Sequence, residues 1–184
     1  DDLCALIYTS GTTGTPKAVM QSHRSMIAPV RYGESSLKEM TSARFLLRLL
    51  RTYDLRFLKW GFRQHSALSP AAMHALLGYS SLIYGLLFGS RVVISDRFHP
   101  GKLLGLIEQE QVNMLMTTPT MVAALLNSRE FSQRKVSSML YVAMGAAPCP
   151  PELVRRAREM FGCPVLIAFG ATEIDESTFD ELEA

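Results

Sequence analysis

The strongest constraint on the fold of this chain is a regular alternation of short apolar runs with longer segments of helical periodicity, which begins near Pro70. Strands are predicted at residues 91–94, 113–116, 139–142 and 165–169, and helices at 76–88 and 100–110 and beginning at 117–120 and 150–152. Strands that alternate with helical segments of about 10–15 residues are typical of βαβ units. We therefore predict an α/β fold with a largely parallel sheet.

Length and composition exclude several classes of protein. The chain has 184 residues, of which 48% are hydrophobic, enough for one compact domain with a core. No apolar run reaches the roughly 18 residues needed to span a bilayer, and the acidic start lacks the features of a signal peptide. Three distant cysteines without a CxxC pair favour free thiols. A net charge of +2 is too small to indicate nucleic acid. We expect a cytoplasmic or organelle-matrix protein, mitochondria included.

Residues 8–17 carry five serine or threonine hydroxyls, two glycines and a lysine in the order Tyr-Thr-Ser-Gly-Thr-Thr-Gly-Thr-Pro-Lys. Glycine lets the backbone curl so that several N–H groups point at one anion, while the hydroxyls and Lys17 add donors and a positive charge. A Walker A loop is excluded because Pro16 precedes the lysine and Ala18 follows it. We interpret this segment as a phosphate-binding loop; the alternative is a polar surface turn.

Apolar residues flank this loop on both sides. Residues 5–8 predict a buried strand that enters it, and residues 18–20 predict a strand that leaves it. A phosphate group would therefore lie in a strand–loop–strand finger without a helix N-terminus beneath it.

Small residues follow the last two predicted strands, at 145–148 and 170–173. Ligands collect where the strands of a parallel sheet end, and small side chains let a flat ligand approach closely. The two loops are therefore candidates for one ligand site.

Residues 37–63 form a basic, amphipathic segment. Seven lysine and arginine residues stand there against two acidic ones, and the large apolar side chains recur at helical spacing. Such a helix can lie on a membrane surface or bind a partner. The alternative is an ordinary surface helix with a solvated basic face.

Four stretches in this order resemble the adenylate-forming superfamily of acyl-CoA synthetases, peptide-synthetase adenylation domains and luciferases. They are residues 8–17, residues 70–74 with Gly78, residues 145–148, and the Phe-Gly-Ala-Thr-Glu run at 169–173. The resemblance covers residues 3–30 and about 68–173. It implies that the chain is a fragment of the large N-terminal domain of such an enzyme.

The family's chemistry implies a role for each matching position. The β- and γ-phosphates of ATP would be held by Thr9, Ser10, Gly11, Thr12, Thr13, Gly14 and Lys17. Gly145, Ala146 and Ala147 would face adenine, on which Phe169 would stack. Thr172 would contact the α-phosphate, Glu173 would bind Mg²⁺, and His74 with Gly78 would line the acyl pocket, so that His74, Thr172 and Glu173 are the candidate catalytic residues. ATP and Mg²⁺ are the implied cofactors, with coenzyme A as co-substrate.

Three of these residues have a structural alternative. His74 lies among apolar neighbours and would fit a core histidine, Phe169 ends an apolar strand and would fit the core, and Glu173 would fit a solvated carboxylate. For His74 and Glu173, the positions relative to the other motifs favour the site.

The resemblance divides the chain into four parts. These are a phosphate-loop strand pair (1–30), an atypical basic insertion or divergent segment (31–67), an α/β adenylate-binding core (68–173) and a divergent acidic tail (174–184). The family's C-terminal lysine domain has no counterpart in this sequence, so we expect the chain to be inactive alone.

The implied function is ATP-dependent activation of a carboxylic acid through an acyl-adenylate, and the surroundings of Phe98 and Pro119 suggest a fatty acyl-CoA synthetase. The expected partner is a small carboxylic acid, with no nucleic acid. The alternative is a truncated, non-catalytic nucleotide-binding or interaction module that uses the basic segment.

Overall fold

The structure is a computed structural model that describes residues 2–9, 15–27, 65–87, 89–170 and 178–181, the last group by its backbone only. Its elements are β1 (Leu3–Thr9), β2 (Lys17–Ser22), β3 (Ser66–Ser69), α3 (Leu76–Leu87), β4 (Arg91–Ile94), α4 (Pro100–Gln109), β5 (Met114–Thr117), α5 (Pro119–Leu126), η2 (Phe131–Gln133), β6 (Tyr141–Met144), α6 (Pro151–Phe161), β7 (Val165–Phe169) and β8 (Thr178–Glu181).

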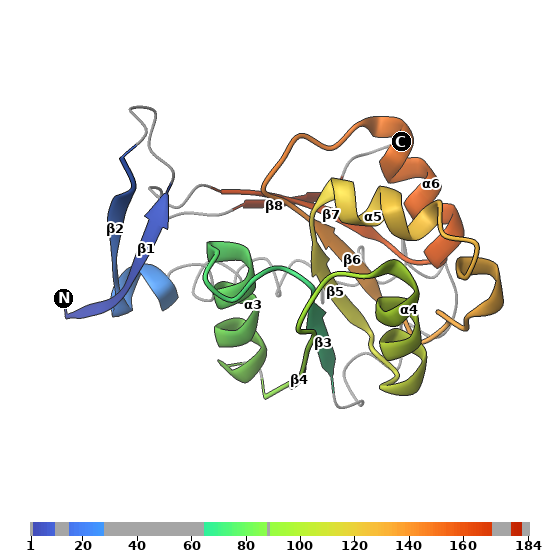
Figure 1. The fold of residues 1–184 in the computed structure, drawn as a ribbon, viewed down its shortest axis with the longest axis horizontal. Helices are drawn as coiled ribbons and strands as arrows, with labels where there is room; N and C mark the ends of the chain where they lie inside the picture. Colours follow the sequence, from blue (N-terminus) through green and yellow to red (C-terminus); the bar gives the residue numbers. More distant parts are fainter. Residues whose placement is uncertain (1, 10–14, 28–64, 88, 171–177, 182–184) are drawn as a thin grey trace, which may run out of the picture.

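Six strands form one sheet in the order β4-β3-β5-β6-β7-β8 (Figure 1). The first five are parallel, and β8 is added antiparallel to β7. The predicted α/β fold with a largely parallel sheet is confirmed. The chain leaves β3 in one direction to form β4 and then turns back past β3 to form β5. This reversal between β3 and β5 is a topological switch point, where α/β sheets place their ligands.

The strand register divides the sheet into two faces. Leu68, Leu115, Val142 and Val165 are successive partners across β3, β5, β6 and β7, so they share a face. These side chains belong to the main hydrophobic core, to which α4, α5 and α6 contribute their buried residues. The opposite face packs against α3, where Gly85 lies against Val92 of β4. The helices thus cover both faces, as parallel sheets require.

The ends of two helices follow from their sequences. In α5 the Thr118 side chain accepts a hydrogen bond from the N–H of Met121 at 3.3 Å, and Pro119 occupies the first helical position. In α6 a proline again opens the helix, and Gly162 ends it in the left-handed conformation (φ 62°). The predicted starts of both helices are confirmed.

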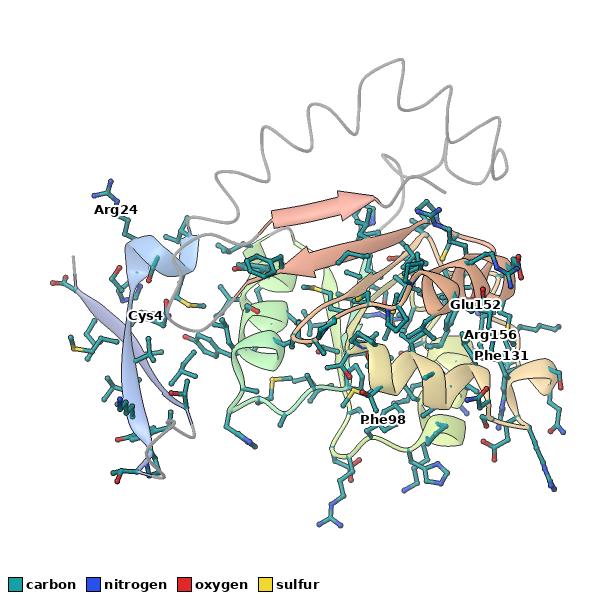
Figure 2. The ribbon with its side chains drawn as sticks, turned by 90° about the horizontal axis from the view of Figure 1, so that it is seen from above. Cys4, Arg24, Phe98, Phe131, Glu152 and Arg156 are labelled. Carbon is teal, nitrogen blue, oxygen red and sulfur yellow. The ribbon has the colours of Figure 1, made fainter. Side chains whose placement is uncertain are left out.

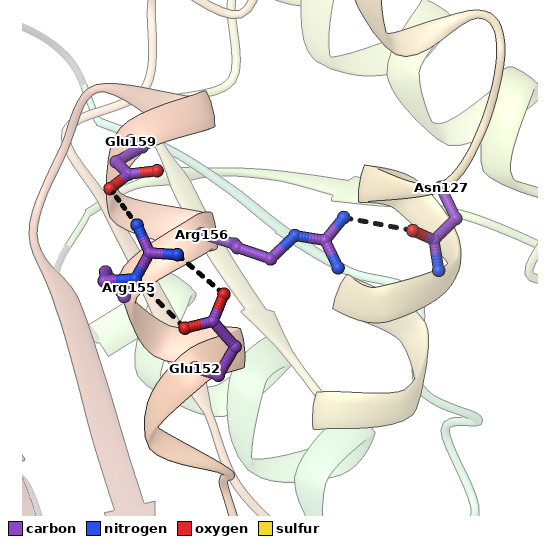
Figure 3. Close-up of polar contacts among 5 residues, drawn as sticks. All are labelled: Asn127, Glu152, Arg155, Arg156 and Glu159. Carbon is purple, nitrogen blue, oxygen red and sulfur yellow. Dashed lines mark hydrogen bonds and ion pairs between the residues drawn. The ribbon is translucent and has the colours of Figure 1, made fainter.

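Helix α6 exposes Glu152, Arg155 and Glu159, and its Arg156 reaches the end of α5 (Figure 3). Arg155 pairs with Glu152 at 2.7 Å and with Glu159 at 2.5 Å, and its hydrogen bond holds the pKa of Glu152 below its usual value. Arg156 instead donates to the side chain of Asn127 at the end of α5, at 3.1 Å. Beneath them Phe161 packs edge-to-face on Phe131, with ring centroids 5.1 Å apart. The Phe131 ring lies beside the carboxyl end of α5 in Figure 2.

Strands β1 and β2 form a separate antiparallel hairpin, followed by a helical segment at residues 23–27. The predicted pair of strands is confirmed, but the expectation that residues 5–8 are buried is wrong, since Leu6 is 50% and Tyr8 is 66% exposed. The hairpin contacts α3 through Cys4, whose Sγ lies 3.6 Å from the hydroxyl of Tyr79 (Figure 2). The hairpin therefore contacts the helix that follows β3.

Two strands of the main sheet were not predicted from the sequence. β3 was missed because it has four residues, two of them serines, and no alternation of polar and apolar positions. All four are buried, and the Ser66 N–H is satisfied by the side-chain oxygen of Asn113 at 3.0 Å. β8 was missed because its sequence is acidic. The helix predicted within 37–63 lies outside the described residues. Within the described part of the chain, no helix is long and apolar enough to cross a membrane.

Candidate functional site

The carboxyl ends of the five parallel strands meet at one edge of the sheet, which we call the C-terminal edge. Residues 70–74 follow β3, Thr118 follows β5, residues 145–148 follow β6, and Phe169 ends β7. Three of the four stretches that carry the family resemblance are thus brought together by the parallel topology (Figure 1). The fourth, the loop of the β1–β2 hairpin, belongs to a separate sheet.

The loop after β6 begins with a glycine that the packing requires. The N–H of Gly145 donates to the carbonyl of Thr117 at 3.0 Å and so continues the β5–β6 ladder. A Cβ at this position would lie 2.9 Å from the carbonyl oxygen and 3.1 Å from the Cβ of Ala168 on β7. Next to this buried glycine, Ala146 and Ala147 are exposed. The predicted slot of small residues is therefore an accessible surface of the C-terminal edge.

Phe169 is the large side chain of this edge. It is 68% exposed, which contradicts the alternative that it belongs to the core. The register pairs Met144 with Ile167, and Gly145 lies against Ala168, so the small-residue loop begins beside the strand segment that ends in Phe169. An exposed aromatic ring beside the small residues 145–147 can hold a planar base by stacking.

Truncation of this ring should weaken base binding without unfolding the protein. We expect Phe169→Ala to reduce AMP affinity roughly fivefold, the lower end of base–aromatic stacking, since one side of the ring is open to solvent. The melting temperature should change by less than about 2 °C because little apolar area is buried there. Calorimetric titration with AMP is the measurement, and Leu87→Ala, which truncates another exposed apolar side chain (52% exposed) at the end of α3, is the control. Equal losses in both variants would contradict stacking by Phe169.

His74 lies in the turn between β3 and α3, at the switch point of the sheet. It is exposed, which contradicts the alternative of a core histidine. Within the turn the N–H of Ala75 donates to the carbonyl of Ala72 at 3.0 Å, and Gly78 of α3 lies directly against that carbonyl. Gly78 thus positions the segment that carries His74, and the acyl-pocket role of both stays a prediction.

Thr9 and Lys17 are register partners at the loop end of the β1–β2 hairpin, where the phosphate loop begins and ends. Lys17 is exposed, so its charge is accessible to a ligand. Ser10, Gly11, Thr12, Thr13 and Gly14 lie outside the described residues, and their predicted phosphate contacts remain predictions.

Thr172 and Glu173 also lie outside the described residues. Among the residues that the structure does describe, no group of three or more His, Cys, Asp or Glu side chains could hold a metal ion. The assignment of Mg²⁺ to Glu173 therefore stays a prediction. A single carboxylate together with substrate phosphates is a common way to bind this ion.

Sequence reasoning missed two features of the C-terminal edge. Thr117 ends β5 with its side chain fully buried, and its hydroxyl has no hydrogen-bond partner in the described structure. Cys149 follows the small-residue loop, with its Sγ 3.7 Å from the carbonyl of Ala147, and burial raises the pKa of its thiol. A raised pKa disfavours the reactive thiolate, so nothing here activates this cysteine as a nucleophile. The sequence signal that could have pointed to Thr117 is its position at the end of a strand.

The fold and the site define an α/β domain with a ligand-binding edge, and comparisons with known proteins establish its family. The profile of the AMP-binding enzyme family matches residues 1–175. The chain belongs to this family, the adenylate-forming enzymes. The matched range runs through residues 31–67, whose interpretation as an insertion stays open.

Relatives and solved structures agree with this assignment. The chain is 30% identical to 4-coumarate–CoA ligase-like 2 of Arabidopsis thaliana, over 94% of its own length and 27% of the relative's. It is 31% identical to 2-succinylbenzoate–CoA ligase of Bacillus subtilis, over 94% and 30%. The structure of o-succinylbenzoate coenzyme A synthetase of Bacillus subtilis in complex with AMP superimposes with a TM-score of 0.72 at 27% identity, over 98% of this chain and 32% of the other. The chain thus spans less than a third of these proteins.

Proposed function

We propose that this chain contributes the adenylate-binding edge of a ligase that activates a small carboxylic acid with ATP and transfers it to coenzyme A. One observation carries the proposal. The small residues 145–147 and the exposed ring of Phe169 lie together at the C-terminal edge of the sheet, in a chain that belongs to the adenylate-forming family. A related synthetase has been crystallised with AMP, and another crystal of it holds ATP and a magnesium ion.

In the proposed reaction, a carboxylate oxygen attacks the α-phosphorus of ATP and the bond to pyrophosphate breaks, giving an acyl-adenylate. A thiolate then attacks the acyl carbon and releases AMP. Negative charge develops on the phosphate oxygens in the first step, so hydrogen-bond donors and cations stabilise it more than an acid or base would. In the described part of the β1–β2 hairpin, Lys17 carries the positive charge that would stabilise these phosphate oxygens. Magnesium, held through Glu173, would neutralise further phosphate charge.

The substrate is proposed only as a carboxylic acid of small size. The surroundings of Phe98 and Pro119 suggest a fatty acid, whereas the names of several relatives specify 4-coumarate, ferulate and 2-succinylbenzoate. Both classes present the same reacting carboxylate and differ in the pocket that holds the remainder. A substrate screen therefore needs to include medium- and long-chain fatty acids together with aryl acids.

Two measurements test the proposal. Calorimetric titration of the chain should show binding of AMP and of ATP with Mg²⁺ but not of GMP. Exchange of labelled pyrophosphate into ATP, measured on the natural full-length product, should depend on an added carboxylic acid. Absence of adenine nucleotide binding would refute the nucleotide assignment, and exchange that no acid stimulates would refute the ligase assignment.

A further inference from the structure

The amino ends of the parallel strands form a second edge of the sheet, and this amino-terminal edge holds a polar cavity. Its volume is about 130 Å³, well above the roughly 10–15 Å³ that one water molecule needs. The walls come from residues at or directly before the starts of β3, β4 and β5, from the end of α4 and from the segment before β6, and every lining side chain is polar or charged. The cavity lies at the opposite end of the strands from Phe169, so it is separate from the proposed nucleotide site.

Two buried side chains supply hydrogen-bond donors to this cavity. Ser66 and Asn113 line it, although they are only 4% and 6% exposed. The side-chain oxygen of Asn113 accepts from the N–H of Ser66 at 3.0 Å, and the hydroxyl oxygen of Ser66 accepts from Arg91 at 3.3 Å. The amide N–H groups of Asn113 and the O–H of Ser66 have no acceptor among the described residues. Buried donors usually have a partner, so this wall is suited to a ligand with acceptor oxygens, such as a carboxylate.

The charged side chains of the cavity are one arginine and one glutamate, which lie next to each other. Arg91 donates to the carboxylate of Glu110 at 2.8 Å and also to the Glu110 carbonyl. A guanidinium and a carboxylate each form several hydrogen bonds, so both groups keep capacity for a ligand. The two side chains are 47% and 40% exposed, and an exposed ion pair contributes little to stability, so a ligand can share it at low cost. His65 adds no charge at slightly alkaline pH, because burial lowers the pKa of its imidazole.

A cavity with adjacent opposite charges discriminates against ions of one sign, since an anion would be repelled by Glu110 and a cation by Arg91. A molecule that carries both charges next to each other is attracted by both side chains. We propose that the cavity at the amino-terminal edge binds a small zwitterion, namely a free α-amino acid with a short side chain. Its carboxylate accepts from Arg91 and from the amide of Asn113, and its ammonium group donates to the carboxylate of Glu110. This site does not rest on the proposed function.

The test is titration of the isotope-labelled chain with glycine and L-alanine at slightly alkaline pH, followed through the backbone amide signals in NMR spectra. Both amino acids should shift the signals of Ser66, Asn113 and their neighbours. Acetate and methylammonium, which present one charge each, should bind roughly tenfold more weakly, because one set of charge-assisted hydrogen bonds is lost. A long ω-amino acid should also bind more weakly, since its two charges are too far apart for the adjacent Arg91 and Glu110.

The decisive variant is Glu110→Gln, which keeps the size of the side chain and the carbonyl that Arg91 binds. It should lower the affinity for glycine roughly tenfold and raise the affinity for acetate, because the negative charge is removed while the donors stay. A residue that only supports the fold would not reverse this preference. The matched control is Glu108→Gln on α4, since Glu108 pairs with Arg134 at 3.2 Å and does not line the cavity. It should leave both affinities unchanged.

Three results would overturn the inference: no shift with either amino acid, equal affinity for acetate and glycine in the original chain, or an unchanged preference in Glu110→Gln. Titration of the same samples with AMP reports on the nucleotide site separately. The two proposals can therefore fail independently of each other.

Discussion

Replacement of Gly78 by alanine should lower the melting temperature by roughly 6–12 °C, the largest stability effect expected from a single methyl group in this protein. A Cβ at Gly78 would lie 2.3 Å from the carbonyl oxygen of Ala72 and 2.8 Å from that of Ala71. Both atoms are backbone, so the clash is relieved only if α3 or the turn before it moves. Overpacking of this kind costs about 3 kcal/mol, the upper end of the usual range.

The same substitution should also displace His74. The turn that carries this residue is held by the hydrogen bond from Ala75 to Ala72, the residue that the new Cβ would push away. If His74 contributes to acid binding, the variant should lose affinity for the carboxylic acid more than for AMP. Thermal unfolding followed by circular dichroism measures the first effect, and separate titrations with acid and nucleotide measure the second.

Gly105→Ala is the control for Gly78→Ala, since it is also a buried glycine within a helix. A Cβ at Gly105 would meet only the guanidinium of Arg134, at 4.0 Å, which is ordinary contact. Alanine is favoured over glycine in a helix by about 1 kcal/mol, so this variant should raise the melting temperature by roughly 2–4 °C. If both variants shift the melting temperature in the same direction, the close packing of Gly78 on the β3–α3 turn would be refuted.

Replacement of Lys17 by alanine should weaken ATP binding roughly 30- to 100-fold. A charge-assisted hydrogen bond to phosphate contributes about 2–3 kcal/mol, and Lys17 is the cation at the end of the hairpin loop. The effect on AMP should be much smaller, because the β- and γ-phosphates assigned to this loop are absent from AMP. The melting temperature should change little, since the side chain is exposed.

Lys135→Ala is the control for this charge. Lys135 is equally exposed and precedes β6 at the opposite edge of the sheet, so its removal changes the net charge without touching the proposed site. Titrations with ATP and AMP should be made at two salt concentrations, because loss of a direct phosphate contact also lowers the salt dependence of binding. Equal losses for ATP and AMP, or a loss in the control of the same size, would contradict the phosphate assignment to Lys17.

The sequence predicted the elements whose signals are local. Helix α6 shows this best, since a proline at its first position, an apolar stripe and a glycine after its last residue each act over a few neighbouring residues. The hairpin was predicted for the same reason, because apolar runs flank a loop of glycine and hydroxyl residues. The resemblance to adenylate-forming enzymes also rests on short motifs, and the family assignment confirmed it. Strand boundaries were less accurate: β6 was predicted two residues too early.

Strand β3 is an element that local sequence signals did not predict. Its sequence, Ser-Ala-Leu-Ser, becomes a central strand because β4 and β5 pair with it on both sides and because Asn113, 47 residues from Ser66 along the chain, satisfies a buried N–H. Without this strand, the switch point of the sheet and the position of His74 beside it were not predictable. For Phe169 the sequence left both stacking in the site and burial in the core open, and the structure decides between them by exposing the ring.

By itself, the amino-acid sequence determined the class of fold, the helices and where they begin, the strand pair of the hairpin and the family, because each depends on residues close together in the chain. Only the tertiary structure decided the order of the strands, the close approach of Gly145 to β7 and of Gly78 to the turn before α3, and the left-handed turn at Ala146. These features depend on atoms from segments far apart in the chain. Backbone contacts and register between such segments exist only once the sheet has formed.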